Sequence, residues 1–173
     1  MVKKILETNR LLLRELTIDD AADFYELNAN PRVIHYTGDS AFVNVEEVLC
    51  FLRNYNDYKE NGYGRWAVIS KSDNEFLGWC GLKYTISKNE TDIGFRFFEK
   101  YWNMGFATES AAACLNYGFD ELNLQKIIGR AMSENKASIK VLQKLGLTFE
   151  KEFDFSGQKG VIYAIEKPFV GRF

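Results

Sequence analysis

The sequence predicts an α+β protein with one domain, on the basis of three observations. Strand patterns at 65–70 and 76–83 are separated by a short polar turn, which is a hairpin signal. Further along, residues 90–147 show the patterns of strand, turn, helix, strand and helix, a βαβα unit. The chain has 173 residues, of which 46% are apolar and 14 are Phe, so one domain with a substantial core is expected.

The N-terminal segment predicts one strand and two helices. Arg10–Leu16 has the pattern of a strand, and Thr17–Asp20 supplies capping residues for a helix that runs to about Asn28. Pro31 then interrupts the pattern. Val45–Tyr58 is predicted as the second helix, because its apolar residues fall along one helical stripe.

Six strands are expected after these helices. Polar residues Lys71–Glu75 form the turn between the first two, and Ser156–Gly160 form the turn between the last two. The predicted strands are, in order, 65–70, 76–83, about 90–98, 126–131, 149–155 and 161–166.

The most informative segment, Trp102–Glu109, joins the strand at about 90–98 to a helix. Thr108–Phe119 has apolar residues at helical spacing, so the turn at Gly105 and Ala107 leads into a helix N-terminus. The first amides of a helix lack intrahelical acceptors and lie at its positive end, where they can bind a phosphate. The segment lacks the Gly-Lys-Ser/Thr of a P-loop and the glycines of a dinucleotide fingerprint. The alternative is that both small residues only let the helix pack closely.

The spacing of Gly105 and Ala107 resembles motif A of the GNAT superfamily of acetyl-CoA-dependent N-acetyltransferases, Gln/Arg-x-x-Gly-x-Gly/Ala. Trp102 stands at the Gln/Arg position. The longer phrase Tyr-Trp-x-x-Gly-x-Ala-Thr-Glu, residues 101–109, resembles the ribosomal-protein N-terminal (alanine/serine) acetyltransferase branch. Glu109 would repel a nearby phosphate unless it pointed away, and we interpret it as a first-turn helix stabiliser.

Residues 135–147 resemble motif B of the same superfamily. Asn135 is expected to cap a helix that Gly146 ends, and Ser138 follows one turn later on nearly the same face. Both could point into one cleft; alternatively, Asn135 only caps the helix and Ser138 bonds to local backbone. Many members have a tyrosine at the position of Leu142, where it protonates the departing thiolate. The resemblance offers Ser138 for that role here.

The resemblance covers about Leu11 to Lys167 of a single domain, 1–173, and implies the GNAT fold. That fold is a three-layer α/β arrangement with a mixed, mostly antiparallel and splayed sheet flanked by helices. It implies acetyl-CoA as cosubstrate, its pantetheine arm between the splayed strands, and no metal. The residues implied for acetyl-CoA are Phe95, Arg96, Phe97, Trp102, Asn103, Met104, Gly105, Phe106, Ala107, Thr108, Asn135 and Ser138.

The implied reaction is direct attack of a neutral amine on the thioester, with a backbone amide near Phe95 stabilising the oxyanion. A cysteine nucleophile would need a base, and the single histidine, His35, is far from any cysteine in the chain. Asp92 and Glu90, with Glu15 as a third candidate, could remove the proton, or they could be simple solvent-facing carboxylates. The expected catalytic residues are Ser138, Asp92 and Asn135.

Amine deprotonation distinguishes the possible acceptors. An α-amine with a pKa of about 7.7–8.0 is roughly one-tenth neutral at pH 7, a cost of about 1.4 kcal/mol, against about 4.6 kcal/mol for lysine. A protein N-terminus therefore requires only a weak base, but a small amine or an aminated antibiotic stays open as the acceptor. The residues expected to bind it, unless their rings belong to the core, are His35, Tyr36, Trp66, Trp79 and Tyr84.

Composition argues against several other classes. The net charge is −2 without a Lys/Arg block, so nucleic acid is not expected as a partner. Three widely spaced cysteines do not suggest a disulfide framework or a zinc site. Without a long apolar run or a signal-peptide core, we expect a cytoplasmic protein, either a monomer or a homodimer, with no membrane partner. A noncatalytic acyl-CoA-binding sensor and a structural protein without cofactor are the alternatives from other classes.

Overall fold

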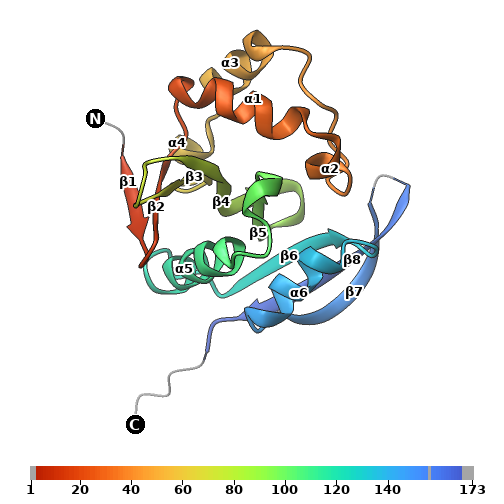
Figure 1. Ribbon diagram of the computed structural model, residues 1–173. Coiled ribbons are helices and arrows are strands. Elements are labelled where there is room, and N and C mark those ends of the chain that lie inside the picture. Colours follow the sequence, from red (N-terminus) through yellow and green to blue (C-terminus); the bar gives the residue numbers. More distant parts are fainter. Residues whose placement is uncertain (1–2, 156, 169–173) are drawn as a thin grey trace.

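A computed structural model describes residues 3–155 and 157–168. Its helices and strands are β1 (Lys4–Glu7), β2 (Leu11–Glu15), α1 (Ala21–Ala29), α2 (Pro31–Ile34), α3 (Val45–Arg53), α4 (Asp57–Glu60), β3 (Arg65–Ser70), β4 (Phe76–Thr85), β5 (Glu90–Phe97), α5 (Phe106–Asp120), β6 (Lys126–Met132), α6 (Lys136–Lys144), β7 (Thr148–Phe155) and β8 (Gln158–Glu166). Within these residues the strands form one eight-stranded sheet in the order β1-β2-β3-β4-β5-β6-β8-β7. Helices α1 and α3 lie on one side of the sheet, and α5 and α6 lie on the other (Figure 1).

The sheet is antiparallel except at one position near its middle. Strands β5 and β6 run parallel and share a single paired position in the described structure, Asp92 opposite Ile128. All other neighbouring strands pair antiparallel over three or more positions. The backbones of β5 and β6 therefore separate beyond this point, which confirms the mixed, splayed sheet that the family resemblance implied.

Two apolar clusters lie on the two faces of the sheet. One joins buried residues of the sheet, such as Leu82 and Ile93, to Cys114 on α5. The other joins Ala67 of β3 to Phe24 of α1 on the opposite side. Because side chains alternate along a strand, the residues of β5 at 92, 94 and 96 face the α1 side. Among the described helices, none is long and apolar enough to cross a membrane.

The predicted helix over 45–58 is wrong in its second half, because the chain breaks into α3 and the short α4. The hydroxyl of Tyr55 accepts a hydrogen bond from the N–H of Arg65 (2.7 Å), and that of Tyr58 accepts one from the N–H of Leu16 (3.0 Å). These bonds satisfy a backbone donor of β3 and one just after the end of β2. Local periodicity cannot indicate them, because the partners are distant in the chain.

Three smaller differences concern ends and short elements. Strand β1 was not predicted, since it is a four-residue edge strand. Helix α2 begins at Pro31, where only an interruption was expected, and Asn30 caps it through the N–H of Arg32 (2.9 Å). Strand β8 begins at Gln158, three residues before the prediction. Ser156, the first residue of the predicted turn, lies outside the described residues.

The three cysteines differ in accessibility, which predicts their reactivity. Cys50 is exposed, whereas Cys80 and Cys114 are fully buried with their sulfur atoms 3.7 Å apart. Burial raises the pKa of the Cys114 thiol well above its ordinary value, which suppresses the reactive thiolate. We expect one thiol per native chain to react rapidly with a disulfide reagent such as DTNB, and all three to react in guanidinium. Two rapidly reacting thiols in the native protein would contradict this burial.

Candidate active site

A cleft of about 830 Å³ lies at the point where β5 and β6 separate. Residues of α2 and the loop after it form one wall, and the start of α5 together with one face of α6 forms the other. The two motifs of the sequence thus meet across one cavity. The predicted site residues that line it are His35, Tyr36, Phe95, Arg96, Phe97, Trp102, Asn103, Gly105, Thr108, Asn135 and Ser138.

The N-terminus of α5 supplies free backbone donors to this cleft. Gly105 is the N-cap residue, with a left-handed φ of +83° and no side-chain cap. The first bond of the helical ladder runs from the N–H of Glu109 to the carbonyl of Gly105 (3.0 Å). Among the described residues, the amides of Phe106, Ala107 and Thr108 therefore remain without an acceptor. This arrangement fits a phosphate group, because the donors converge at the positive end of the helix.

The carboxylate of Glu109 is held on the side away from the cleft. It accepts hydrogen bonds from Thr8 Oγ1 (2.5 Å), from the N–H of Arg10 (3.1 Å) and from Arg10 Nε (2.6 Å). The Arg10 guanidinium also donates to the carbonyl of Met104 (3.1 Å). Arg10 therefore ties the turn to the β1–β2 hairpin, a role that the sequence could not indicate because 99 residues separate the two partners.

The contacts of Glu109 make its stabilising effect dependent on pH. Burial alone raises the pKa of Glu109, but hydrogen bonds from Thr8 and Arg10 outweigh it, so the pKa lies below the ordinary 4.5. A depressed pKa stabilises the folded state above the unfolded pKa, and this stability is lost as pH falls through the folded pKa. We expect Glu109→Gln to lower the unfolding free energy by about 1–3 kcal/mol at pH 7.

Chemical denaturation of Glu109→Gln and the unmodified protein at several pH values measures this effect. The difference between them should close below the ordinary pKa of 4.5. Glu121→Gln serves as a matched control, because it removes the same charge from an exposed residue just after the same helix. A difference that stays constant down to acid pH would mean that the carboxylate charge does not matter.

Backbone N–H and carbonyl groups along one edge of β5 face the cleft. The indole Nε1–H of Trp102 donates to the carbonyl of Phe97 (2.9 Å), and the N–H of Phe98 bonds to the carbonyl of Leu77 on β4 (3.1 Å). Backbone groups of successive residues point to opposite edges of a strand. The N–H and carbonyl of Phe95 therefore share the edge of Phe97, which faces the gap toward β6.

Helix α6 forms the second wall. The side chain of Asn135 caps it by accepting from the N–H of Ser138 (3.1 Å), which confirms the predicted cap. Leu142, at the position where related enzymes have a tyrosine, is 2% exposed and packs over Gly129 instead of facing the cleft. Lys140 and Lys144 do line the cleft. Their spacing of one helical turn places both on one face of α6, and that spacing is the sequence signal that indicates the shared face.

Three of the five residues expected to bind the acceptor lie elsewhere. Trp66 is 1% exposed in the core beneath α5, where its ring meets Tyr117 edge-on at 5.5 Å. Trp79 lies between the guanidinium groups of Arg65 and Arg96, at 5.5 and 5.2 Å from its ring. Tyr84 donates its hydroxyl to Asn89 near the end of β4 (2.7 Å). Strand alternation and core packing place all three outside the cleft.

Some expected cofactor residues contribute no side chain to the cleft. Met104 is 52% exposed, and Phe106 packs under the Arg10 guanidinium, 4.3 Å from its ring centre. Ala107 packs against the apolar cluster beneath α5. For Phe106 and Ala107, only the backbone N–H is available to a ligand.

Asp92 also lies outside the cleft lining. It is 9% exposed, and its carboxylate forms ion pairs with Arg65 (2.5 Å) and Arg130 (3.6 Å). Glu90 pairs with the same Arg130. Of the three expected catalytic residues, Ser138 and Asn135 are thus in the cleft, while Asp92 belongs to a buried ionic network.

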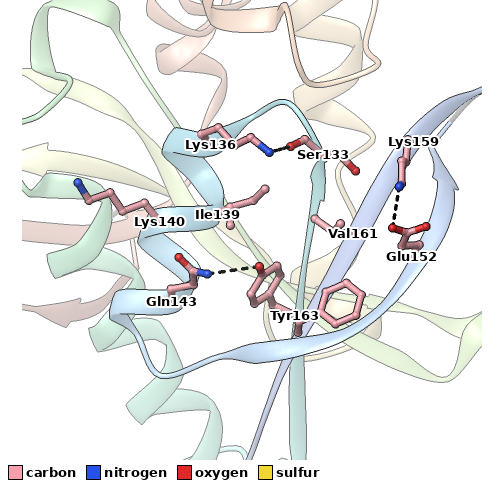
Figure 2. Close-up of a pocket in the computed structure, with 10 residues that line it drawn as sticks. Ser133, Lys136, Ile139, Lys140, Gln143, Glu152, Lys159, Val161 and Tyr163 are labelled. Atoms are coloured by element: carbon pink, nitrogen blue, oxygen red, sulfur yellow. Dashed lines mark hydrogen bonds and ion pairs between the residues drawn. The ribbon is translucent and has the colours of Figure 1, made fainter.

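A second cavity, of about 680 Å³, lies between α6 and the β7–β8 hairpin (Figure 2). Within it, the amine of Lys136 donates to the carbonyl of Ser133 (2.6 Å), and Lys159 pairs with Glu152 (2.8 Å). The groups that line this cavity therefore bond mainly to one another. It shares only Lys140 with the cleft between β5 and β6.

Comparisons with known proteins agree with this arrangement. Residues 10–148 match the acetyltransferase (GNAT) domain model. An uncharacterised N-acetyltransferase from Bacillus licheniformis is 32% identical over 149 residues, or 85% of this chain and 83% of that protein. The crystal structure of an acetyltransferase of the GNAT family from Bacillus anthracis has a TM-score of 0.81 at 28% identity and covers 96% of this chain and 99% of its own. A ribosomal L7/L12 alpha-N-protein acetyltransferase in complex with coenzyme A has a TM-score of 0.81 at 16% identity, covering 95% and 98%.

Proposed function

Because this chain belongs to the GNAT acetyltransferase family and is an acetyl-CoA-dependent N-acetyltransferase, we propose that its acceptor is the α-amine of a protein N-terminus. The observation that supports this acceptor is the charge of the cleft. Among the described residues that line it, four are Arg or Lys and none has a carboxylate. A polyamine has several positive charges at neutral pH and would meet mainly like charge there, because the carboxylates nearest to the lining, Glu99 and Asp39, are already paired with Arg32 and Arg96. A peptide presents a single amine at its end.

We assign acetyl-CoA to the half of the cleft between α5 and α6. The free amides of Phe106, Ala107 and Thr108 would bind its phosphate groups. Lys140 and Lys144 add two positive charges on the same cleft, and neither is ion-paired in the part of the chain that the structure describes. Acetyl-CoA brings the activated acetyl group, and the chain supplies its binding and orientation.

The residues around the gap have separate roles in this proposal. When the amine nitrogen bonds to the thioester carbon and the carbon–sulfur bond breaks, negative charge develops first on the carbonyl oxygen and then on sulfur. The N–H of Phe95 would stabilise the first charge, because it faces the gap. The hydroxyl of Ser138 would donate its proton toward sulfur, and Asn135 positions Ser138 by capping the same turn.

Proton removal favours the same acceptor. Asp92 is paired with two arginines, which leaves the exposed His35 as the side chain of the cleft wall with a nitrogen that can act as a general base. Such a base can accept the proton of an α-amine, which costs about 1.4 kcal/mol to neutralise at pH 7. For lysine the corresponding cost is about 4.6 kcal/mol.

Mass spectrometry of competing acceptors tests the proposal. The purified protein and acetyl-CoA would be incubated with lysine-free peptides with free N-termini, N-terminally blocked lysine peptides, spermidine and aminoglycosides. We expect the free N-termini to gain one acetyl group first, and the same peptides with blocked N-termini to gain none. Faster acetylation of spermidine, lysine or an aminoglycoside would overturn the proposed acceptor while leaving the family assignment intact.

A further inference from the structure

A network of four charged side chains lies at the base of the gap between β5 and β6. Arg65, which reaches across β4, pairs with Asp92 of β5 (2.5 Å), and Arg130 of β6 pairs with both Asp92 (3.6 Å) and Glu90. Side-chain exposure is 15% for Arg65, 13% for Asp92, 16% for Arg130 and 25% for Glu90. The two positive and two negative charges balance, so the network is neutral. We call these four residues the strand clasp.

The strand clasp lies at the place where the backbone stops connecting the two strands. Asp92 and Ile128 form the one paired position between β5 and β6, and Arg130 comes two residues later on the separating side. By this register Arg130 lies opposite Gly94, and a Cβ at Gly94 would lie 2.7 Å from the Arg65 guanidinium. The absence of a side chain at Gly94 therefore makes room for the clasp.

The clasp also connects to the backbone of the sheet. Arg65 donates to the carbonyl of Gly81 and to that of Asp92 (3.0 Å). Arg130, by contrast, is the member that comes from β6. Its two ion pairs are thus the connection that the clasp makes between the two strands, at the end of the gap that Phe95 and Phe97 line further along.

We propose that Arg130 is a positioning residue that sets the separation of β5 and β6, and thereby the width of the gap that receives the pantetheine arm and thioester. The proposal rests on the assignment of acetyl-CoA to this cleft. Loss of Arg130 frees the two strands to shift relative to each other, because within the described residues a single backbone pairing joins them. Ligands that enter the gap should be affected, and ligands that contact only the start of α5 should not.

Two probes separate these cases. Coenzyme A extends into the gap, whereas adenosine 3′,5′-bisphosphate lacks the pantetheine arm. Isothermal titration calorimetry should show that Arg130→Met weakens coenzyme A binding by about tenfold or more, with less than about twofold change for the bisphosphate. Arg130→Lys, which retains the charge but not the two-pronged geometry, should fall between. Lys126→Met is the matched control, because it removes a charge from β6 at a surface ion pair with Glu150.

A neutral double variant excludes simple loss of folding. Glu90→Gln combined with Arg130→Met removes one charge of each sign and leaves the Arg65–Asp92 pair intact. It should show the same selective loss of coenzyme A binding. Equal weakening of both probes in the variants, or no weakening of either, would overturn the positioning role. If the unmodified protein bound neither probe, the cofactor assignment itself would fail instead.

Discussion

Gly105→Glu is expected to abolish measurable acetyl-CoA binding. The new side chain would place a negative charge at the free amides of α5, where the phosphate groups are proposed to bind. Losing two hydrogen bonds to a charged group, each contributing about 1.5–3 kcal/mol, corresponds to a loss of affinity of more than about 100-fold. Titration calorimetry with acetyl-CoA on the folded variant measures this directly.

The control for Gly105→Glu must reproduce its backbone strain. Gly105 has a φ of +83°, and a non-glycine residue in that region costs roughly 1–2 kcal/mol. Gly62→Glu introduces the same residue at a φ of +80°, where no atom of the described residues would lie within 4 Å of the added Cβ. We expect both variants to lose similar stability and only Gly105→Glu to lose binding. Unchanged affinity in Gly105→Glu would mean that phosphate does not bind at this turn.

Ser138→Ala is expected to lower kcat by about 10²–10⁴-fold, the usual contribution of general acid catalysis. The substitution removes the hydroxyl that faces the cleft. It leaves the N–H of Ser138 bonded to Asn135, so the cap of α6 is retained. The affinity for acetyl-CoA should therefore change little, and the loss should appear in the rate of transfer under saturating substrates.

A nearby serine provides the comparison for this rate. Ser133 lines the second cavity, and its hydroxyl has no hydrogen-bond partner among the described residues. Ser133→Ala should leave kcat unchanged within about twofold, since its hydroxyl is not in the cleft. A fall of less than about threefold in Ser138→Ala would exclude Ser138 as the acid.

Local sequence signals predicted most of the elements correctly. The turn at Gly105, the cap at Asn135 and the hairpin between β3 and β4 each depend on residues within a few positions of one another. Their physical causes are φ preference, side-chain capping and alternation, all of which act over one turn or one strand. The predicted helix over 45–58 was wrong in its second half because the hydroxyl groups of Tyr55 and Tyr58 accept hydrogen bonds from the backbone of Arg65 and Leu16, which lie outside the helix.

Predictions of individual side-chain roles were less accurate, since exposure depends on distant packing. Trp66 has an aromatic ring that would suit the wall of a pocket, but it lies in the core. Leu142 packs over Gly129. Asp92 has a carboxylate that could act as a base, but it forms ion pairs with Arg65 of β3 and Arg130 of β6. No local pattern indicates these partners, because each comes from another strand.

The sequence by itself determined the resemblance to the family, the two motifs and the order of β2 to β8 along the chain, because periodicity and small-residue turns depend on neighbouring residues. Only the tertiary structure decided which residues share the cleft. It placed α2 across from α5 and α6, added Lys140 and Lys144 to the cleft, and gathered Arg65, Asp92 and Arg130 into the clasp. The physical reason is that burial and charge pairing arise from the packing of distant segments, and the separation of β5 and β6 exists only once those segments have met.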